Sequence, residues 1–483
     1  MDVSIVQVAL PTLGKEFNRG PDTVVWATLI SSLVVTGLTL TMGRAGDLFG
    51  RKRIYITGWV VFTIGMAAAT FAATIEQLVA LRFVQAVGVA MAIANGNAIV
   101  TDAFPDNQRG RALGTTGAVV GAGLMSGPIL GGFIIELLDW RALFYLRVPI
   151  GLISMVMALF LVRESEGHTG ARKFDIPGAL TLFAALSTGL LGVNRGQSWG
   201  WTSPLILGLL AASAFFVFAF LRVESKAASP VISLALFKIR SFSVSVASLV
   251  LNFAGQSAVT FLMPFYLITV RGYSTGYTGF VQATVPSMML LLSPFSGVIS
   301  DRWGFRHQTT LGVALVSAGL LSLSTIDGGT STPMIMARLA VIGIGTAIFQ
   351  SPNSSAIMGT VPRNMLGTAS ASIGTSRNIG NAIGLAMSSA ILVGVASATS
   401  GLTGVRTDKL PPDALLDGIR MAFLVAGLVS SLAIFASLLR KARVPTLERV
   451  EELLPPMPVS QRAMAHARLK PQRDYPVAQP GGR

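Results

Sequence analysis

Long apolar segments separated by short polar breaks fill most of the 483-residue sequence. Most segments are about 20 residues long, which at 1.5 Å of rise per residue is the helix length needed to cross roughly 30 Å of hydrocarbon. The alternating ten-residue pattern of barrel strands is absent from the sequence. A chain in lipid must bond its backbone within helices or a closed barrel. We therefore predict an all-α, polytopic membrane protein.

The apolar segments predict about fourteen transmembrane helices, the first of them shortened. Residues 1–13 would form about 20 Å of helix, too little to cross the layer alone. We expect this stretch to be the outer part of a first helix, with residues missing ahead of Met1. The other expected spans are 24–42, 55–74, 77–100, 111–135, 142–162, 176–194, 203–222, 242–270, 278–298, 308–326, 334–357, 368–398 and 418–439.

Composition and charge support this class. Hydrophobic residues make up 52% of the chain and charged residues 12%, against roughly 25% charged in soluble domains. The net charge of +15 would suit a nucleic-acid partner, but the basic residues lie on alternate loops, as the positive-inside rule requires. We expect a monomer in the cytoplasmic membrane with both termini cytoplasmic, with lipid and no nucleic acid as partner. The absence of cysteine excludes a disulfide framework.

A glycine-rich charged loop occurs twice between apolar segments, with the spacing Gly-x3-Asp-x2-Gly followed by an arginine. Glycines let helix ends approach closely, and an aspartate can accept from N–H groups at a helix N-terminus or pair with the neighbouring arginine. We predict two gate loops in a transporter built from two related halves; simple topogenic anchoring is the alternative. The residues are Gly43, Asp47, Gly50, Arg51, Gly297, Asp301, Gly304 and Arg306.

Four stretches resemble motifs of the major facilitator superfamily, and within it of the fourteen-helix drug:proton antiporter-2 family. Residues 43–53 resemble the loop between helices 2 and 3, and residues 82–88, RFVQAVG, resemble the R-x-x-Q-x-x-G motif of helix 4. Residues 117–132 resemble the helix-5 antiporter motif. Residues 2–11, DVSIVQVALP, are similar to the helix-1 motif D-x-T-I-V-N-V-A-L-P, with Gln7 in place of the usual asparagine.

The resemblance implies two six-helix bundles around an inserted pair. We expect a first bundle at 1–162, two inserted helices and a linker at 163–240, and a second bundle at 241–439. Residues 440–483 are basic and proline-rich and are expected to form a disordered cytoplasmic tail. The tail would attract anionic lipid, and a regulatory or partner-binding role is the alternative.

A charge within the bilayer is costly and is therefore a functional candidate. Asp2 would lie near mid-membrane on the first helix, and Arg82 about one turn inside the outer end of its helix. The resemblance implies that such a carboxylate and arginine couple transport to protons. In this mechanism Asp2 is protonated from outside and releases the proton to the cytoplasm. A permanent structural ion pair, or an exposed terminal aspartate, is the alternative.

Two further groups of residues are candidates. The glycines of the helix-5 stretch would give one smooth face for a neighbouring helix, and the proline would permit a bend. The resemblance assigns this stretch to sealing and hinging in antiporters, with general packing as the alternative. Its residues are Gly121, Gly127, Pro128, Gly131 and Gly132. Polar residues that line a cavity, or else join helices by hydrogen bonds, are Gln85, Asn95, Asn97, Gln256, Gln350 and Arg377.

The sequence offers no candidate for enzymatic chemistry. It contains no G-x4-G-K-[ST] loop, its three histidines are scattered, and no nucleophile can be paired with a base. We expect no cofactor and no metal, with the proton gradient as energy source. The predicted function is proton-driven export of amphipathic small molecules by alternating access. The alternatives are a transport-inactive binding or sensor protein of the same fold, and a uniporter or importer for a specific metabolite.

Overall fold

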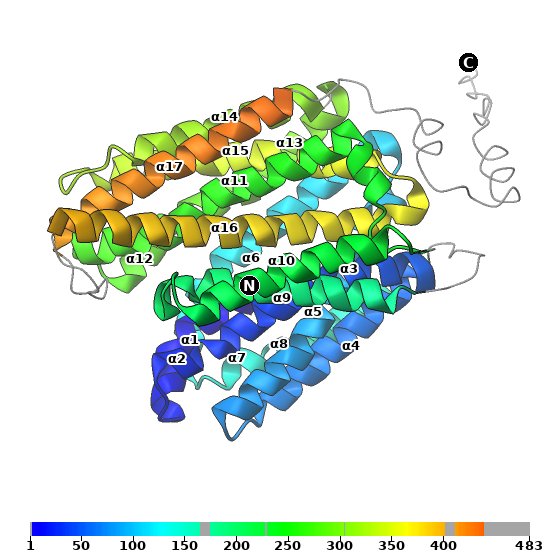
Figure 1. Cartoon of the computed structure of the whole chain (residues 1–483), viewed down its shortest axis with the longest axis horizontal. Helices are drawn as coiled ribbons and strands as arrows, with labels where there is room; N and C mark the ends of the chain where they lie inside the picture. Colours follow the sequence, from blue (N-terminus) through cyan, green and yellow to red (C-terminus); the bar gives the residue numbers. More distant parts are fainter. Residues whose placement is uncertain (1, 165–173, 228, 304, 401–410, 439–483) are drawn as a thin grey trace, which may run out of the picture. The chain divides into compact units, whose positions relative to one another are not determined.

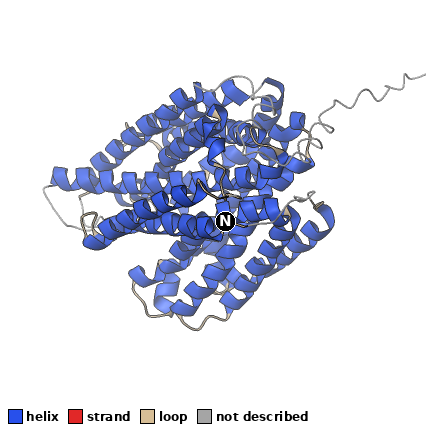
Figure 2. Ribbon diagram, turned by 45° about the vertical axis from the view of Figure 1, so that its right-hand side comes forward, coloured by secondary structure: helices blue, strands red, loops and turns tan. Residues whose placement is uncertain are grey.

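The computed structural model describes residues 2–164, 174–227, 229–303, 305–400 and 411–438. All regular structure within these ranges is helical (Figure 2), which confirms the predicted all-α class. The helices up to residue 161 are α1 (Asp2–Glu16), α2 (Pro21–Val24), α3 (Trp26–Phe49), α4 (Arg51–Thr70), α5 (Ile75–Ala103), η1 (Asp106–Gln108), α6 (Arg109–Leu137), α7 (Ala142–Tyr145) and α8 (Arg147–Leu161).

The remaining helices continue the same architecture (Figure 1). They are α9 (Ile176–Trp199), α10 (Pro204–Glu224), η2 (Leu234–Lys238), α11 (Arg240–Pro264), the π-helical η3 (Phe265–Val270), α12 (Thr275–Gln282), α13 (Thr284–Trp303), α14 (Phe305–Leu323), α15 (Thr332–Gly359), η4 (Arg363–Met365), α16 (Leu366–Ser400) and α17 (Pro412–Leu438). The expected tail at 440–483 lies outside the described residues.

Eleven helices among the described residues are long and apolar enough to cross a membrane, counted by length and composition. The number fourteen and the division into two bundles with an inserted pair stay predictions. Two spans expected to be continuous are broken: the stretch at 142–162 divides between α7 and α8, and that at 278–298 begins within α12.

The predicted loop at 43–53 is wrong in extent. Helix α3 continues to Phe49 and α4 begins at Arg51, so that Gly50 alone interrupts the two helices. Gly50 has φ 103°, a conformation that residues with a Cβ rarely adopt. One glycine thus turns the chain, and Gly43 and Asp47 are presented from a helix. The second copy ends α13 at Trp303 and begins α14 at Phe305, and Gly304 lies outside the described residues.

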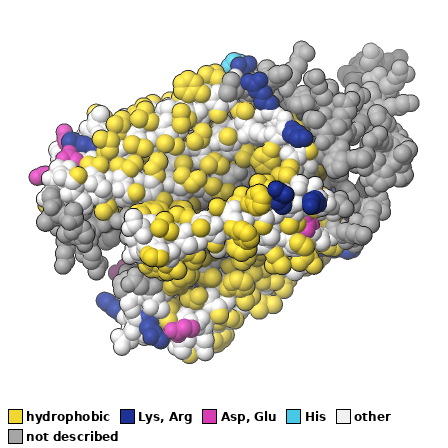
Figure 3. Space-filling view, viewed as in Figure 1, with side chains coloured by type: hydrophobic (Ala, Val, Ile, Leu, Met, Phe, Trp, Pro, Cys, Tyr) yellow, Lys and Arg dark blue, Asp and Glu magenta, His cyan; other side chains and the backbone are white. Residues whose placement is uncertain are grey.

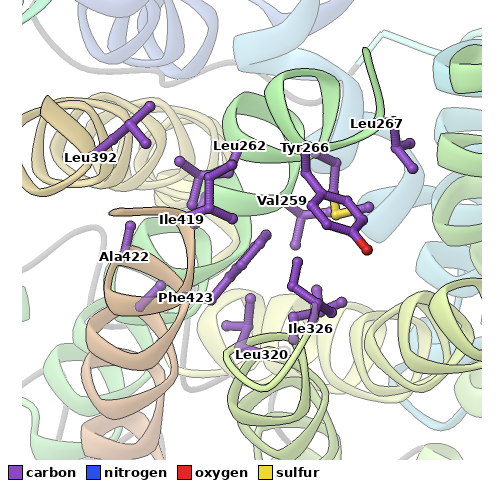
Figure 4. Close-up of a cluster of buried hydrophobic side chains, with 14 of the residues drawn as sticks. Val259, Leu262, Tyr266, Leu267, Leu320, Ile326, Leu392, Ile419, Ala422 and Phe423 are labelled. Atoms are coloured by element: carbon purple, nitrogen blue, oxygen red, sulfur yellow. The ribbon is translucent and has the colours of Figure 1, made fainter. Parts of the chain in front are cut away.

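Each half of the chain has its own apolar core. In the first half, side chains of α1, α4 and α5 pack around Trp140 and Phe144. In the second half, side chains of α11, η3, α14, α15 and α17 form a larger cluster, in which Phe423 of α17 lies beside Leu320 of α14 and Ile419 of α17 lies beside Leu262 of α11 (Figure 4). Separate cores allow each half to remain folded while contacts between the halves change.

Apolar side chains also cover much of the surface. On the face shown in Figure 3, hydrophobic side chains occupy the middle, and charged side chains gather toward the ends. Helices α8 and α10 expose large apolar residues, among them Phe160 at 83%, Phe215 at 64% and Phe218 at 56%. Lipid tails would cover such a surface without the cost that water imposes.

The helix pair α9–α10 lies against the junction of the two halves. Helix α9 packs on α10, on α3 of the first half and on α16 of the second. The segment that follows α10 returns to this junction, where Val231 and Ile232 are buried with Leu40 of α3 and Ala371 of α16. Arg44 Nη2 of α3 donates to Ser229 Oγ of the same segment at 2.9 Å, so the pair is bound next to the predicted gate residues.

A close glycine crossing joins two helices in each half. A Cβ at Gly58 of α4 would lie 2.8 Å from the carbonyl oxygen of Gly88 in α5. In the second half, a Cβ at Gly345 of α15 would lie 2.6 Å from the carbonyl oxygen of Gly312 in α14. Because the obstacle is backbone in both cases, it cannot rotate away as a side chain would. These crossings make α4–α5 and α14–α15 tightly packed pairs.

Alanine at either crossing is expected to destabilise the fold. Gly88→Ala and Gly345→Ala should each cost about 1–3 kcal/mol, because the new methyl group forces two backbones apart. The measurement is the thermal midpoint of the detergent-purified protein, followed by the loss of its monodisperse chromatographic peak. Gly394→Ala is the matched control, since a Cβ there meets nothing within 4 Å and should leave the midpoint unchanged or slightly higher. Equal midpoints in all three variants would contradict the packing described.

Candidate functional site

Asp47 of α3 binds the first residues of α16 across the two halves. Its Oδ1 accepts from the backbone N–H of Gly367 at 2.8 Å. Its Oδ2 accepts from the N–H and the hydroxyl of Thr368, at 2.8 and 2.9 Å. The first N–H groups of a helix have no partner within it, and the helix dipole favours an anion there. Asp47, 5% exposed, therefore caps a helix that lies 320 residues away in sequence; we name this contact the Asp47 latch.

Arg51, one turn further at the start of α4, holds the Asp47 latch in place. Its Nη2 lies 3.0 Å from Asp47 Oδ1, and its Nη1 lies 3.4 Å from Asp102 Oδ2 at the end of α5. The same guanidinium donates to the carbonyl oxygen of Arg363, in the turn before α16. A buried arginine with two carboxylates and a carbonyl has its charge compensated. Arg51 thus joins three elements of the first half to the second half.

Asp301 of α13 makes the corresponding contact in the opposite sense. Its Oδ1 accepts from the N–H of Gly110 at 2.7 Å, and its Oδ2 from the N–H of Arg111 at 2.8 Å. These are the first residues of α6, so here the second half caps a helix of the first; we name this contact the Asp301 latch. Ser351 of α15 adds a hydrogen bond of 2.8 Å to the carbonyl oxygen of Gly110.

Arg306 is not part of the Asp301 latch. We expected it to be the counterpart of Arg51, but its Nη2 donates to the carbonyl oxygen of Leu438 at the end of α17, at 3.1 Å. Among the described residues, Asp301 forms no ion pair. The spacing explains the difference. Arg51 directly follows the turn glycine Gly50, whereas Phe305 separates Arg306 from Gly304 in the sequence. Arg306 is therefore shifted by one residue and points to another helix.

Small residues let the latches form, because the backbones meet. A Cβ at Gly43 would lie 2.5 Å from both the carbonyl oxygen of Gly367 and the Cβ of Ala371. At the other latch, a Cβ at Gly110 would lie 2.6 Å from the carbonyl oxygen of Gly297, and the reverse substitution would collide with Gly110. Glycine at these positions therefore allows α3 to touch α16 and α13 to touch α6.

Both latches lie at the same end of the helices. Asp102, which Arg51 contacts, ends α5 only a few residues before Gly110, which Asp301 binds. The capped helices also share a signal that sequence reasoning missed. Each begins within the pattern Pro-x-Asn-x2-Gly, at 105–110 and at 362–367, one residue before its glycine, and each pattern contains a one-turn helix, η1 or η4. This repeat marks the N–H donors, as the glycine-aspartate repeat marks the acceptors.

The residues expected to couple protons lie elsewhere. Arg82 is fully buried on α5, where its Nε donates to the carbonyl oxygen of Ala27 at 3.0 Å and its Nη1 donates to Gln85 Oε1. Ala27 lies near the start of α3, so Arg82 is at the end opposite to the latches. Asp2 begins α1, but its side chain lies outside the described part of the structure. Their pairing stays a prediction.

The helix-5 glycines do not form one face for one neighbour. On α6, a Cβ at Gly121 would lie 2.9 Å from the backbone of α13, whereas a Cβ at Gly131 would lie 3.5 Å from Ile5 of α1. Gly127 is buried. The contact with α13 runs instead through Gly110, Gly114, Gly117 and Gly121. The surroundings of Pro128 and Gly132 lie outside what the structure describes.

Two of the expected cavity residues face the interior of the first half. Gln85 is fully buried and accepts from Arg82; Asn95 is fully buried and donates to the carbonyl oxygens of Met42 and Met91. Gln85 Oε1 and Asn95 Nδ2 are thus bonded inside the helix bundle, as the hydrogen-bonding alternative expects, and a role in lining a cavity stays a prediction. Four others retain accessible surface, namely Asn97, Gln256, Gln350 and Arg377. Of these, Gln256 donates to Thr346 Oγ1 of α15.

The chain is similar to known transporters. It matches the family model described as Major Facilitator Superfamily over residues 1–385. It is 33% identical over 386 residues to the riboflavin transporter RibZ of Clostridioides difficile, covering 80% of this chain and 83% of that protein. It is 30% identical over 400 residues to the multidrug resistance protein Stp of Mycobacterium tuberculosis, covering 83% of this chain and 74% of that protein.

A solved structure supports the same fold. The proton:xylose symporter XylE, bound to 6-bromo-6-deoxy-D-glucose, matches with a TM-score of 0.63 at 15% identity, over 94% of this chain and 95% of that one. The chain is thus an integral membrane transporter with multidrug-transporter relatives, and not an enzyme. Membership of the fourteen-helix antiporter-2 subtype stays a prediction. With a family model that matches well over half of its length, the chain belongs to the major facilitator superfamily.

Proposed function

We propose that this chain exports amphipathic small molecules in exchange for protons, by alternating access. The observation that carries the proposal is the pair of latches at one end of the molecule, at Asp47 and Asp301. Each latch is a small set of hydrogen bonds between the halves, so the halves can separate there without disrupting either apolar core. Opening at this end breaks both latches, and closing restores them.

The latch end is assigned to the cytoplasm. It carries Arg44, Arg51, Lys52, Arg53 and Arg363, together with the basic residues at the starts of α6 and α14. Cytoplasmic ends of membrane helices are rich in lysine and arginine. The described state is then closed to the cytoplasm, and both termini are cytoplasmic.

The relatives support transport of amphipathic compounds. Stp and the Bacillus subtilis protein MdtP, 29% identical over 416 residues, are both named for multidrug resistance or transport. A second candidate function is transport of one metabolite, favoured by the similarity to RibZ, which is named a riboflavin transporter. Riboflavin is itself an amphipathic ring system with a polar chain, so one transport assay can test both candidate functions.

Proton coupling is proposed through Asp2 and Arg82. Protonation from outside would remove the attraction between the carboxylate and the guanidinium, and release of the proton to the cytoplasm would restore it. The burial of Arg82 at the end opposite to the latches supports this role, because a buried guanidinium favours the ionised form of a carboxylate beside it.

Purified protein in vesicles is expected to move compounds when a pH gradient is imposed. The assay measures uptake into vesicles of a panel of amphipathic dyes and drugs, with riboflavin included. Uptake of several panel members would support multidrug export, and uptake of riboflavin alone would favour the single-metabolite function. A properly folded protein that moves no compound under either sign of the gradient would contradict transport and favour the sensor alternative.

Asp47→Asn and Asp301→Asn are each expected to open the cytoplasmic end more often. An amide lacks the charge that the helix N-terminus attracts, and hydrogen bonds to charged groups are worth about 1.5–3 kcal/mol. Because the chain has no cysteine, single reporters can be introduced: Ser372→Cys beside the Asp47 latch and Ser293→Cys beside the Asp301 latch, where Ser293 of α13 faces Gly117 of α6. Maleimide added from the cytoplasmic side should label these cysteines about tenfold faster or more in the asparagine variants.

Asp413→Asn is the matched control for the latch variants. Asp413 is an exposed aspartate in the first turn of α17 and takes no part in either latch. Its substitution should leave both labelling rates unchanged. Unchanged labelling in the Asp47 and Asp301 variants, with the fold intact, would remove the gating role from the two contacts.

Asp2→Asn is expected to abolish proton-linked transport while leaving expression intact, since an amide cannot carry a proton between the two sides. The measurement is substrate movement driven by a pH gradient, compared with counterflow of the same substrate without a gradient. Loss of the first with retention of the second supports the coupling role. Unchanged pH-driven movement would remove Asp2 from the mechanism.

A further inference from the structure

Arg377 of α16 is a charged residue without a polar partner in the described structure. No hydrogen bond or ion pair joins its guanidinium to any described residue. Its contact is with the ring of Phe253 on α11, whose centroid lies 6.0 Å from the guanidinium carbon. Arg377 is only partly buried, although it follows a run of fully buried residues on the same helix. A charge within a membrane-spanning helix must be solvated, so this one faces a space that water or a solute can enter.

The position of Arg377 on its helix shows where that space lies. Gly380 and Gly384 face α11, since a Cβ at either would collide with the backbone of that helix. Gly374 faces the first half, where a Cβ would lie 3.4 Å from side chains of α3 and α5. By helical geometry Arg377 lies between these two directions, and the exposed Asn381 lies one turn further on the same face. The polar face of α16 is thus turned toward the junction of the halves.

Lipid exposure does not explain the accessible surface of Arg377. The apolar residue Ile383, 45% exposed, lies about 120° away from Arg377 around α16, on a different face that lipid would cover. Other arginines of this half are bonded to backbone: Arg338 Nη1 donates to the carbonyl oxygen of Ser322 at 2.7 Å, and Arg420 Nε donates to that of Ile326. Arg377 differs from these two arginines in that none of its donors meets a polar atom of the described residues.

We propose that Arg377 binds the anionic group of a substrate, and that the substrates include amphipathic anions with a carboxylate or sulfonate on an aromatic body. This inference rests on the proposed function and names a substrate class for it. The guanidinium presents paired N–H donors that match two anion oxygens. No carboxylate of the described residues is bound to it, so an anionic ligand would not have to displace one. Phe253, against the guanidinium, is placed to stack on the ligand's ring.

The test compares 2-naphthoate with the neutral 2-naphthamide, which has nearly the same shape. Binding to the detergent-purified full chain is measured by titration calorimetry. The wild type should bind the naphthoate about tenfold tighter or more, as expected for a charge-assisted pair. Arg377→Gln should remove that preference and leave naphthamide binding unchanged. Arg377→Lys, which retains the charge without the paired donors, should keep part of the preference.

Arg338→Gln is the matched control and should keep the full preference, since the guanidinium of this residue is already bonded to the carbonyl oxygen of Ser322 at the end of α14. Equal affinity of the wild type for both probes, or a preference that survives in Arg377→Gln, would overturn the inference. Loss of both ligands together in Arg377→Gln, with normal binding of both in Arg377→Lys, would also overturn it, because the role would then be structural.

The vesicle assay separates this inference from the proposed function. A wild type that moves compounds under a pH gradient but binds anions independently of Arg377 would overturn the substrate class alone. A wild type that binds 2-naphthoate through Arg377 but moves nothing would overturn transport and keep the binding site.

Discussion

A carboxylate from one half of the chain that caps a helix of the other half is the contact on which the described state depends. The aspartate needs donors because it is buried, and the helix N-terminus needs an acceptor because its first N–H groups have none. Each satisfies the other in the Asp47 latch and in the Asp301 latch. The geometry requires glycine on both sides, since the two backbones touch. The closed end is therefore held by a few polar contacts between surfaces of small residues.

The two latches are built unequally. The Asp47 latch includes Arg51, which also reaches Asp102 and the carbonyl oxygen of Arg363, whereas among the described residues Asp301 binds backbone N–H groups alone. The helix pair α9–α10 and the segment after it pack on the same side as the Asp47 latch, where Arg44 is bonded to Ser229. More contacts join the halves at the Asp47 latch, where Arg51 compensates the charge and a helix pair is added. Fewer contacts must be broken to separate the halves at the Asp301 latch.

Within each half the contacts are of another kind. Separate apolar cores and backbone-tight glycine crossings make α4–α5 and α14–α15 units that resist deformation. Between the halves lie small residues, polar latches and the accessible face of α16 that carries Arg377. Firm units joined by breakable contacts suit a motion of one half against the other around a central site. A ligand at Arg377 would then lie between the parts that move.

The sequence by itself determined the all-α membrane class, the approximate spans and the family, because apolar length and the spacing of glycine, aspartate and arginine are local properties. It also predicted that Asp47 and Asp301 would bind a helix N-terminus or an arginine. Only the tertiary structure decided which N-terminus each one caps, since the partners are 320 and 191 residues apart. It likewise placed Gln85 and Asn95 in the interior and Arg306 on another helix. The sequence pattern around a polar residue in a helix is the same whether its side chain packs against another helix or lines a cavity. Which of the two occurs depends on neighbouring helices that sequence spacing does not specify.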